Sequence, residues 1–263
     1  MNTVSEHVKF DNDSGLRLSG RIDRPVDKPR GWALFAHCFT CTKNLLAANH
    51  MSRTLAQAGI GVLRFDFTGL GNSEGEFAAT TFSHNVDDLV AAARYLEATH
   101  GSPRLLVGHS LGGTAALHAA ARLDGVRAVA TVAAPAHAAH VAGLLRSSLA
   151  EIEATGEAEV DLGGRVFRIR REFLEDLRRQ ATLDLVRQLR CALLVLHSPI
   201  DVTVDVANAA DIFAAARHPK SFVSLDRADH LLTAERDAVY AGQVIAIWAG
   251  RYMQGDSPPV HPW

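Results

Sequence analysis

The chain has 263 residues and a formal net charge of −2 at pH 7, and 48% of its residues are hydrophobic. Its longest apolar runs are only as long as a strand, which excludes a membrane-spanning helix and predicts one large α/β domain. The near-neutral charge, without a basic stripe, argues against nucleic acid as a partner. Residues 1–9 form no apolar leader and three cysteines make no disulfide framework, so we expect a cytoplasmic location.

The first predicted elements form an antiparallel hairpin, with strands at 4–11 and 15–22 around a turn at 12–15. Short apolar runs then alternate with helical patterns along the chain. The expected strands are 32–36, 61–67, 104–107, 126–133, 191–196 and 221–225, and the expected helices are 45–57, 82–99, 114–122, 206–216 and 235–251. This alternation predicts an α/β fold with a mostly parallel central sheet and helices on both faces. The loops at the carboxyl ends of the strands should gather at one edge of the sheet.

The alternation breaks between residues 135 and 189. This stretch predicts a helix at 144–154, a hairpin around Gly163-Gly164 and a charged helix at 172–180. An insertion of this length indicates a cap over the active site, and the alternative is a surface addition without a role there. We therefore expect an α/β core formed by 1–134 and 190–254, a small cap at 135–189 and a flexible tail at 255–263.

The strongest motif is Gly108-His109-Ser110-Leu111-Gly112, which joins an apolar strand to an alanine-rich helix. This strand–turn–helix context is that of a nucleophile elbow, in which a strained turn exposes the serine hydroxyl. The alternative interpretation is a flexible glycine turn, but the flanking strand and helix favour Ser110 as the nucleophile.

An acid and a base follow Ser110 in the order that this topology requires. Asp201 comes just after the expected strand that ends near 196, and His230 follows the next strand. We expect His230 to accept the proton of the Ser110 hydroxyl, and Asp201 to orient the imidazole. Asp205 is the competing acid, although its position suits the first turn of a helix better.

The backbone N–H groups of Phe39 and Leu111 are the expected oxyanion donors, because Leu111 directly follows the nucleophile and Phe39 follows the first parallel strand. His37 is expected to brace this loop rather than to act as a base. The expected substrate pocket comprises His37, Cys38, His109, Leu144 and Leu145.

Cys38 and Cys41 form a Cys-x-x-Cys pair beside the expected oxyanion loop. This spacing suits a redox pair or two ligands of a metal site. Because no second cluster accompanies the pair, we favour small packing side chains, and we expect neither a metal nor a cofactor.

The elbow, the loop Asp66-Phe67-Thr68-Gly69-Leu70-Gly71-Asn72-Ser73 and the pair Asp201 and His230 resemble the α/β-hydrolase superfamily. The segments 35–41, 63–71 and 228–232 resemble more narrowly the hydrolase half of bifunctional α/β-hydrolase/OsmC proteins. The resemblance covers almost the whole chain and implies an α/β-hydrolase fold with serine-esterase activity. Two features depart from it: no OsmC domain follows in these residues, and His37-Cys38 stands where many members have His-Gly.

The expected function is hydrolysis of carboxylic esters with small to medium acyl chains, through a Ser-His-Asp triad and an acyl-enzyme. An aminopeptidase- or amidase-like activity is the second interpretation, since the same triad can serve it. A catalytically silent fold that binds a ligand is the third. The expected partner is a small-molecule ester, while a homodimer and a separately encoded OsmC-like partner stay open.

Overall fold

The computed structural model describes residues 2–162 and 164–253, so the predicted tail at 255–263 lies outside the described residues. Its main element is a single eight-stranded sheet. The strands of this sheet are β1 (Thr3–Asp11), β2 (Arg17–Pro25), β3 (Trp32–Ala36), β4 (Gly61–Phe65), β5 (Pro103–His109), β6 (Ala128–Val132), β9 (Ala192–His197) and β10 (Lys220–Ser224). They lie in the order β1-β2-β4-β3-β5-β6-β9-β10.

The sheet is parallel from β4 to β10, whereas β1 pairs with β2 and β2 with β4 in antiparallel fashion. The N-terminal hairpin and the mostly parallel sheet are therefore confirmed. Every residue of β3, β4, β6 and β9 is buried, as expected for strands that are covered on both faces.

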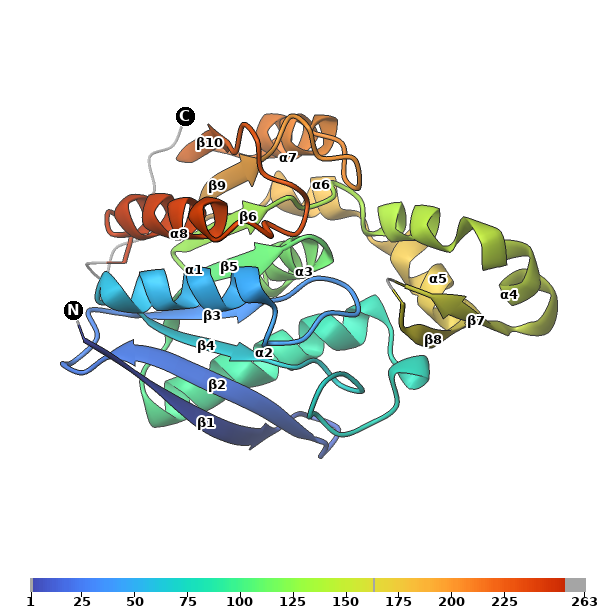
Figure 1. The fold of residues 1–263 in the computed structure, drawn as a ribbon, viewed down its shortest axis with the longest axis horizontal. Coiled ribbons are helices and arrows are strands. Elements are labelled where there is room, and N and C mark those ends of the chain that lie inside the picture. The colour runs from blue at the N-terminus through green and yellow to red at the C-terminus, as the bar shows by residue number, and fades with distance from the viewer. Residues whose placement is uncertain (1, 163, 254–263) are drawn as a thin grey trace.

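Helices cover both faces of the sheet, as predicted (Figure 1). One face carries α1 (Leu46–Gln57) and α8 (Glu235–Ala249). The other face carries α2 (Phe82–Thr99), α3 (Leu111–Ala120), α6 (Thr182–Val186) and α7 (Ala207–Ala215). Two short helices, α6 and η1 (Phe77–Ala79), were not predicted.

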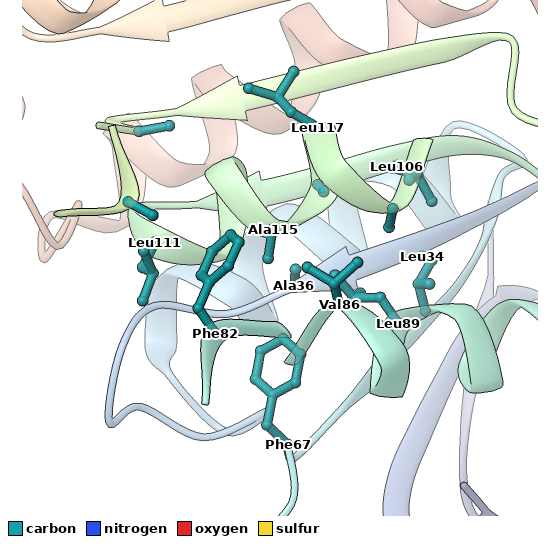
Figure 2. Packing of buried hydrophobic residues seen from close by; sticks show 14 of the residues in the cluster. Leu34, Ala36, Phe67, Phe82, Val86, Leu89, Leu106, Leu111, Ala115 and Leu117 are labelled. Carbon is teal, nitrogen blue, oxygen red and sulfur yellow. The ribbon is translucent and has the colours of Figure 1, made fainter. Parts of the chain in front are cut away.

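The packing of α3 fixes where the turn at Ser110 lies. Figure 2 shows Leu34 and Leu106 of the sheet beside Val86 and Leu89 of α2, with Ala115 of α3 among them. Small side chains such as Ala115 let α3 lie close to the sheet, and this close packing leaves little room for the helix to shift. The start of α3, and with it the turn before the helix, is thereby held in place.

The predicted cap is a separate lobe beside the carboxyl ends of the strands (Figure 1). It contains η2 (Ala138–Ser148), α4 (Leu149–Thr155), β7 (Glu157–Asp161), β8 (Val166–Arg170) and α5 (Arg171–Arg179). The helix predicted at 144–154 is wrong in its first half, which is 3₁₀. Gly143, Ser147 and Ser148 are weak helix formers, so regular α-helix begins only at Leu149.

The cap is fastened to the core at the first turn of α2. The Asp176 carboxylate of α5 accepts hydrogen bonds from the backbone N–H (2.7 Å) and hydroxyl (2.8 Å) of Ser83. The carboxylate thus satisfies an N–H that has no acceptor within α2 and lies at the positive end of the helix dipole.

Candidate active site

Ser110 occupies a strained turn between β5 and α3. Its φ of 54° and ψ of −130° are unusual for a residue with a side chain, and its N–H donates to Val132 O at 2.9 Å. A Cβ on Gly108 would collide with the backbone of Gly112, and one on Gly113 would lie 2.6 Å from Ala134 Cβ. The small residues around the elbow are therefore required by space, and they allow the serine to rise above the sheet.

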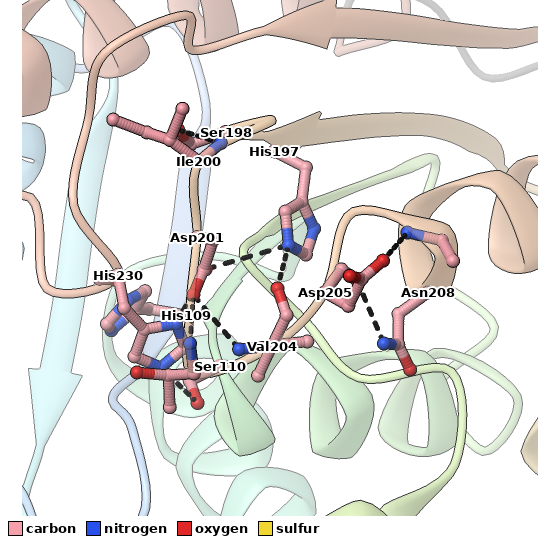
Figure 3. A network of polar contacts seen from close by, with 12 residues as sticks. His109, Ser110, His197, Ser198, Ile200, Asp201, Val204, Asp205, Asn208 and His230 are labelled. Atoms are coloured by element: carbon pink, nitrogen blue, oxygen red, sulfur yellow. Dashed lines mark hydrogen bonds and ion pairs between the residues drawn. The ribbon is translucent and has the colours of Figure 1, made fainter.

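Three predicted residues meet at the carboxyl edge of the sheet (Figure 3). Ser110 Oγ lies 3.0 Å from His230 Nε2, and His230 Nδ1 lies 2.8 Å from Asp201 Oδ2. A carboxylate can only accept a hydrogen bond, so Nδ1 carries the proton and Nε2 presents its lone pair to the serine hydroxyl. The side chain of Asp201 is fully buried, whereas that of His230 is 11% exposed.

The Asp201 carboxylate is held as an anion in a fixed orientation. Its Oδ1 accepts the backbone N–H groups of Thr203 (2.8 Å) and Val204 (2.9 Å). Burial by itself would raise the pKa of Asp201, but the hydrogen bonds from His230, Val204 and Thr203 outweigh it and lower the pKa below its ordinary value. The competing acid, Asp205, instead accepts the N–H of Ala207 (2.8 Å) at the start of α7.

Two further buried histidines hold the loops of this site. His109 Nε2 donates to the carbonyl of His230 at 2.7 Å, and His197 Nε2 donates to the carbonyl of Val204 at 2.7 Å. Burial lowers the pKa of both rings, that of His109 to about 4. Both rings are therefore neutral near pH 7, so neither places a positive charge beside His230. Sequence reasoning missed His197; its only signal is its place at the end of a strand.

The two expected oxyanion donors lie where α3 meets the end of β3. A Cβ on Gly112 would collide with the carbonyl oxygens of Ala36 and His37, so helix and strand end are in close contact. Leu111 is the first residue of α3, so its N–H has no acceptor within the helix. His37 braces the adjoining loop, because its Nδ1 donates to Cys38 O at 2.9 Å and burial lowers its pKa to about 4.

A disulfide joins Cys38 and Cys41, so the favoured interpretation of the pair as small packing side chains was wrong. The loop forms a turn in which the N–H of Cys41 donates to Cys38 O at 3.1 Å, and this turn brings the two Cα atoms to 5.3 Å. Thr40, within the turn, has a φ of 59°. The disulfide closes the loop that contains Phe39.

Four phenylalanines, which we call the aromatic cluster, connect this loop to the cap. The ring of Phe39 stacks on Phe173 of α5 at 5.3 Å and lies 5.7 Å from the ring of Phe77. Phe77 in turn makes an edge contact with Phe167 of β8 at 5.0 Å. Such pairs contribute about 0.5–1.5 kcal/mol each beyond the burial of their area. The position of Phe39 therefore depends on the cap.

A cavity of about 610 Å³ opens beside Ser110 and His230. Its wall comes from the loop around the disulfide, from the cap and from the segment after β9. The lining residues include Phe39, Leu45, Pro135, Val141, Leu162, Arg165, Val204 and Leu231. A cavity of this size and mainly apolar lining suits a small organic molecule.

The predicted pocket residues are only partly correct. Cys38 lines the cavity, but His37 and His109 are at most 1% exposed and are not among its lining residues. Leu145 is fully buried and packs in the hydrophobic core instead. Leu144 belongs to η2, and its side chain lies outside the described residues.

Residues 2–162 and 164–253 contain no group of three or more His, Cys, Asp or Glu that could hold a metal ion. None of the helices in these ranges has the length and apolarity needed to cross a bilayer.

The chain is similar to known hydrolases. A monoacylglycerol lipase of Mycolicibacterium smegmatis is 29% identical over 140 residues, which are 52% of this chain and 49% of that protein. The chain thus matches about half the length of this curated relative. The crystal structure of the esterase domain of a Rhodothermus marinus protein is 52% identical, with a TM-score of 0.79 and coverage of 97% and 100% of the two chains.

Mouse α/β-hydrolase domain-containing protein 10 shares the fold at 21% identity, with a TM-score of 0.77 and coverage of 94% of this chain and 99% of that one. Residues 27–158 match the family described as serine aminopeptidase, S33. This match contains the elbow and the loop of Phe39 and covers half of the chain. The chain therefore belongs to this hydrolase family, within the α/β-hydrolase superfamily.

Proposed function

We propose that this protein is a serine hydrolase that cleaves carboxylic esters of small to medium acyl chains. The observation that carries the proposal is the continuous chain from Ser110 Oγ through His230 to Asp201, with both links at or below 3.0 Å. The similarity to an esterase domain and to a monoacylglycerol lipase supports an ester as the substrate.

The proposed reaction begins when His230 Nε2 takes the hydroxyl proton of Ser110 and Oγ attacks the ester carbonyl carbon. The negative charge on the carbonyl oxygen is stabilised by the N–H groups of Phe39 and Leu111. Collapse of this intermediate transfers the proton from His230 to the leaving alkoxide and releases the alcohol. Water, deprotonated by the same imidazole, then attacks the acyl carbon. The bond to Oγ breaks as His230 returns the proton to Ser110, and the carboxylic acid is released. Asp201 keeps the proton on Nδ1 throughout.

Labelling with a fluorophosphonate, followed by peptide mass mapping, tests the nucleophile directly. We expect an adduct on Ser110 in the wild-type protein and only slow labelling in His230→Ala, because the hydroxyl needs its base. Asp205→Asn is the matched control and should label at the wild-type rate. A folded wild-type protein without an adduct would refute the esterase and favour a catalytically silent binding protein.

An aminopeptidase- or amidase-like activity is the second candidate, and the description of the matched family favours it. The same proton transfers serve an amide, whose leaving amine must also be protonated by His230. Initial rates on 4-nitrophenyl butyrate and on a series of aminoacyl 4-nitroanilides decide between the two. A higher kcat/KM for any anilide than for the ester would make the peptidase the primary activity.

A further inference from the structure

One cationic side chain of the cap, Arg165, lies at the wall of the catalytic cavity. Its guanidinium donates a hydrogen bond to the carbonyl of Thr40 at 3.2 Å and lies 4.9 Å from the centre of the Phe167 ring. These contacts, one to the disulfide loop and one to β8, restrict a side chain that is otherwise exposed. A guanidinium has five N–H donors, so most of them stay available for a ligand.

The charge of Arg165 has no carboxylate partner among the described residues. Several other arginines of the cap do have such partners: Arg170 pairs with Glu157 at 3.2 Å, and Arg178 pairs with Glu153 at 3.1 Å. Of the described residues that line the cavity, Arg165 is the only lysine or arginine, and none of them is an aspartate or glutamate. The cavity therefore combines an apolar wall with one uncompensated positive charge.

We infer that Arg165 forms a subsite for an anionic group of the substrate, so that the preferred esters carry a carboxylate away from the scissile bond. The inference rests on the proposed ester hydrolysis. Arginine suits this role because its planar N–H groups bind both oxygens of a carboxylate. The apolar wall would contact the carbon chain between the ester and the anion.

The position of Thr40 limits the distance between the subsite and the reacting carbonyl. Phe39 N–H should lie about 3 Å from the developing oxyanion, and two extended residues span at most about 7 Å. Adding the 3.2 Å from Thr40 O to the guanidinium places Arg165 within roughly 13 Å of the reacting oxygen. A short dicarboxylic acid that is esterified at one end fits this range.

The test compares charged esters with neutral isosteres. For the acyl side, we would measure kcat/KM for 4-nitrophenyl hydrogen adipate and 4-nitrophenyl adipamate, in which a carboxamide replaces the carboxylate. For the alcohol side, the pair is 4-carboxyphenyl butyrate and 4-carbamoylphenyl butyrate. We expect wild-type protein to prefer the charged member of one pair by about ten-fold, as for a hydrogen bond to a charged group. This preference should shrink in 0.5 M salt.

Arg165→Gln should abolish the charge preference and lower the rate on the neutral esters by a smaller factor. Arg168→Gln is the matched control, since Arg168 lies on the same hairpin but pairs with Glu157 at 3.5 Å and Glu159 at 3.6 Å. Arg168→Gln should keep the wild-type ratio of kcat/KM for the charged ester to kcat/KM for its neutral isostere. The proposed subsite would be refuted if this ratio is near one for the wild-type protein in both ester pairs. It would also be refuted if the ratio is unchanged in Arg165→Gln. Equal losses on charged and neutral esters would also overturn it and would assign Arg165 to positioning of the loop.

A binding measurement separates this inference from the proposed reaction. Calorimetric titration of the wild-type protein and of Arg165→Gln with adipate and with adipamide needs no turnover. Adipate should bind to wild type at least about five-fold more tightly than adipamide, and Arg165→Gln should lose the difference. Absence of ester turnover, together with selective adipate binding, would refute the esterase and keep the anion site. Equal binding of both compounds would refute the site.

Discussion

Replacing Asp201 by asparagine tests the orientation of the catalytic imidazole. In the wild-type protein, Oδ1 of Asp201 accepts the N–H groups of Thr203 and Val204 while Oδ2 faces His230 Nδ1. The oxygen of an asparagine should stay with the two backbone donors, so its NH₂ group would face Nδ1. The imidazole would then place its proton on Nε2, toward the hydroxyl of Ser110, and could no longer accept the serine proton.

The size of the effect follows from the two backbone hydrogen bonds. Rotating the amide to restore the productive tautomer would leave both N–H groups unsatisfied, at about 1–3 kcal/mol each. A cost of at least about 2 kcal/mol leaves no more than roughly one molecule in thirty productive. The corresponding substitution in the general triad mechanism lowers kcat by about 10⁴. We therefore expect Asp201→Asn to lower kcat by between roughly 30-fold and 10⁴-fold.

Steady-state kinetics on 4-nitrophenyl butyrate measures this loss, with circular dichroism to check the fold. Asp205→Asn is the control and should stay within about two-fold of wild type, because the amide oxygen can still accept the N–H of Ala207. The reasoning fails if Asp201→Asn keeps more than a third of the wild-type kcat. A large loss in Asp205→Asn instead would exchange the two acids.

Ser110→Ala and His230→Ala should each abolish nearly all ester turnover, and the double variant should lose little more, because a triad acts as a unit; an active His230→Ala would contradict the assigned base. Acid should destabilise the fold, because burial lowers the pKa of His118 from 6.5 to about 4 in the folded protein. As the pH falls below 6.5, the imidazole of His118 gains a proton in the unfolded chain but stays neutral in the folded one. Urea unfolding should show that the free energy of unfolding of the wild-type protein decreases between pH 7 and pH 5, and that about 2 kcal/mol of this decrease comes from His118. His118→Gln should therefore show a smaller decrease, and an equal decrease in both proteins would refute this. Phe173→Leu should lower kcat several-fold with little change in KM, because the loop that holds an oxyanion donor loosens. Tyr95→Leu, which removes a stacked ring outside the site, should leave kcat unchanged, and equal effects in both variants would contradict a specific role.

The meeting of Ser110, Asp201 and His230 could be predicted because local rules place these residues. Each follows a strand of the parallel part of the sheet, β5, β9 or β10, and such strands deliver their carboxyl ends to a common edge. The positions around Ser110 must be glycine, because a Cβ there would collide with neighbouring atoms. This requirement is visible in the sequence as a recognisable motif. The order Ser110, Asp201, His230 then leaves few ways to assign the roles.

The cavity wall could not be predicted in the same way. It depends on how the cap packs. Leu145 was expected in the pocket because it is an apolar residue of the cap, but it lies in the 3₁₀ segment η2 and is fully buried. In the sequence, Arg165 cannot be distinguished from the other charged residues of the hairpin. Only its contact with Thr40 in the structure shows that it lies beside the site. The disulfide likewise depends on the turn at Cys38, which the Cys-x-x-Cys spacing permits but does not require.

The aromatic cluster also bears on how this protein could diverge or be redesigned. Caps of hydrolases are attractive modules to exchange between scaffolds when a new substrate range is wanted. Here, the ring of Phe39 packs directly on Phe173 of the cap, so a transplanted cap would alter the surroundings of the loop that we propose supplies an oxyanion donor. A successful chimaera should therefore carry an aromatic residue at the position of Phe173, or replace the loop of Phe39 together with the cap.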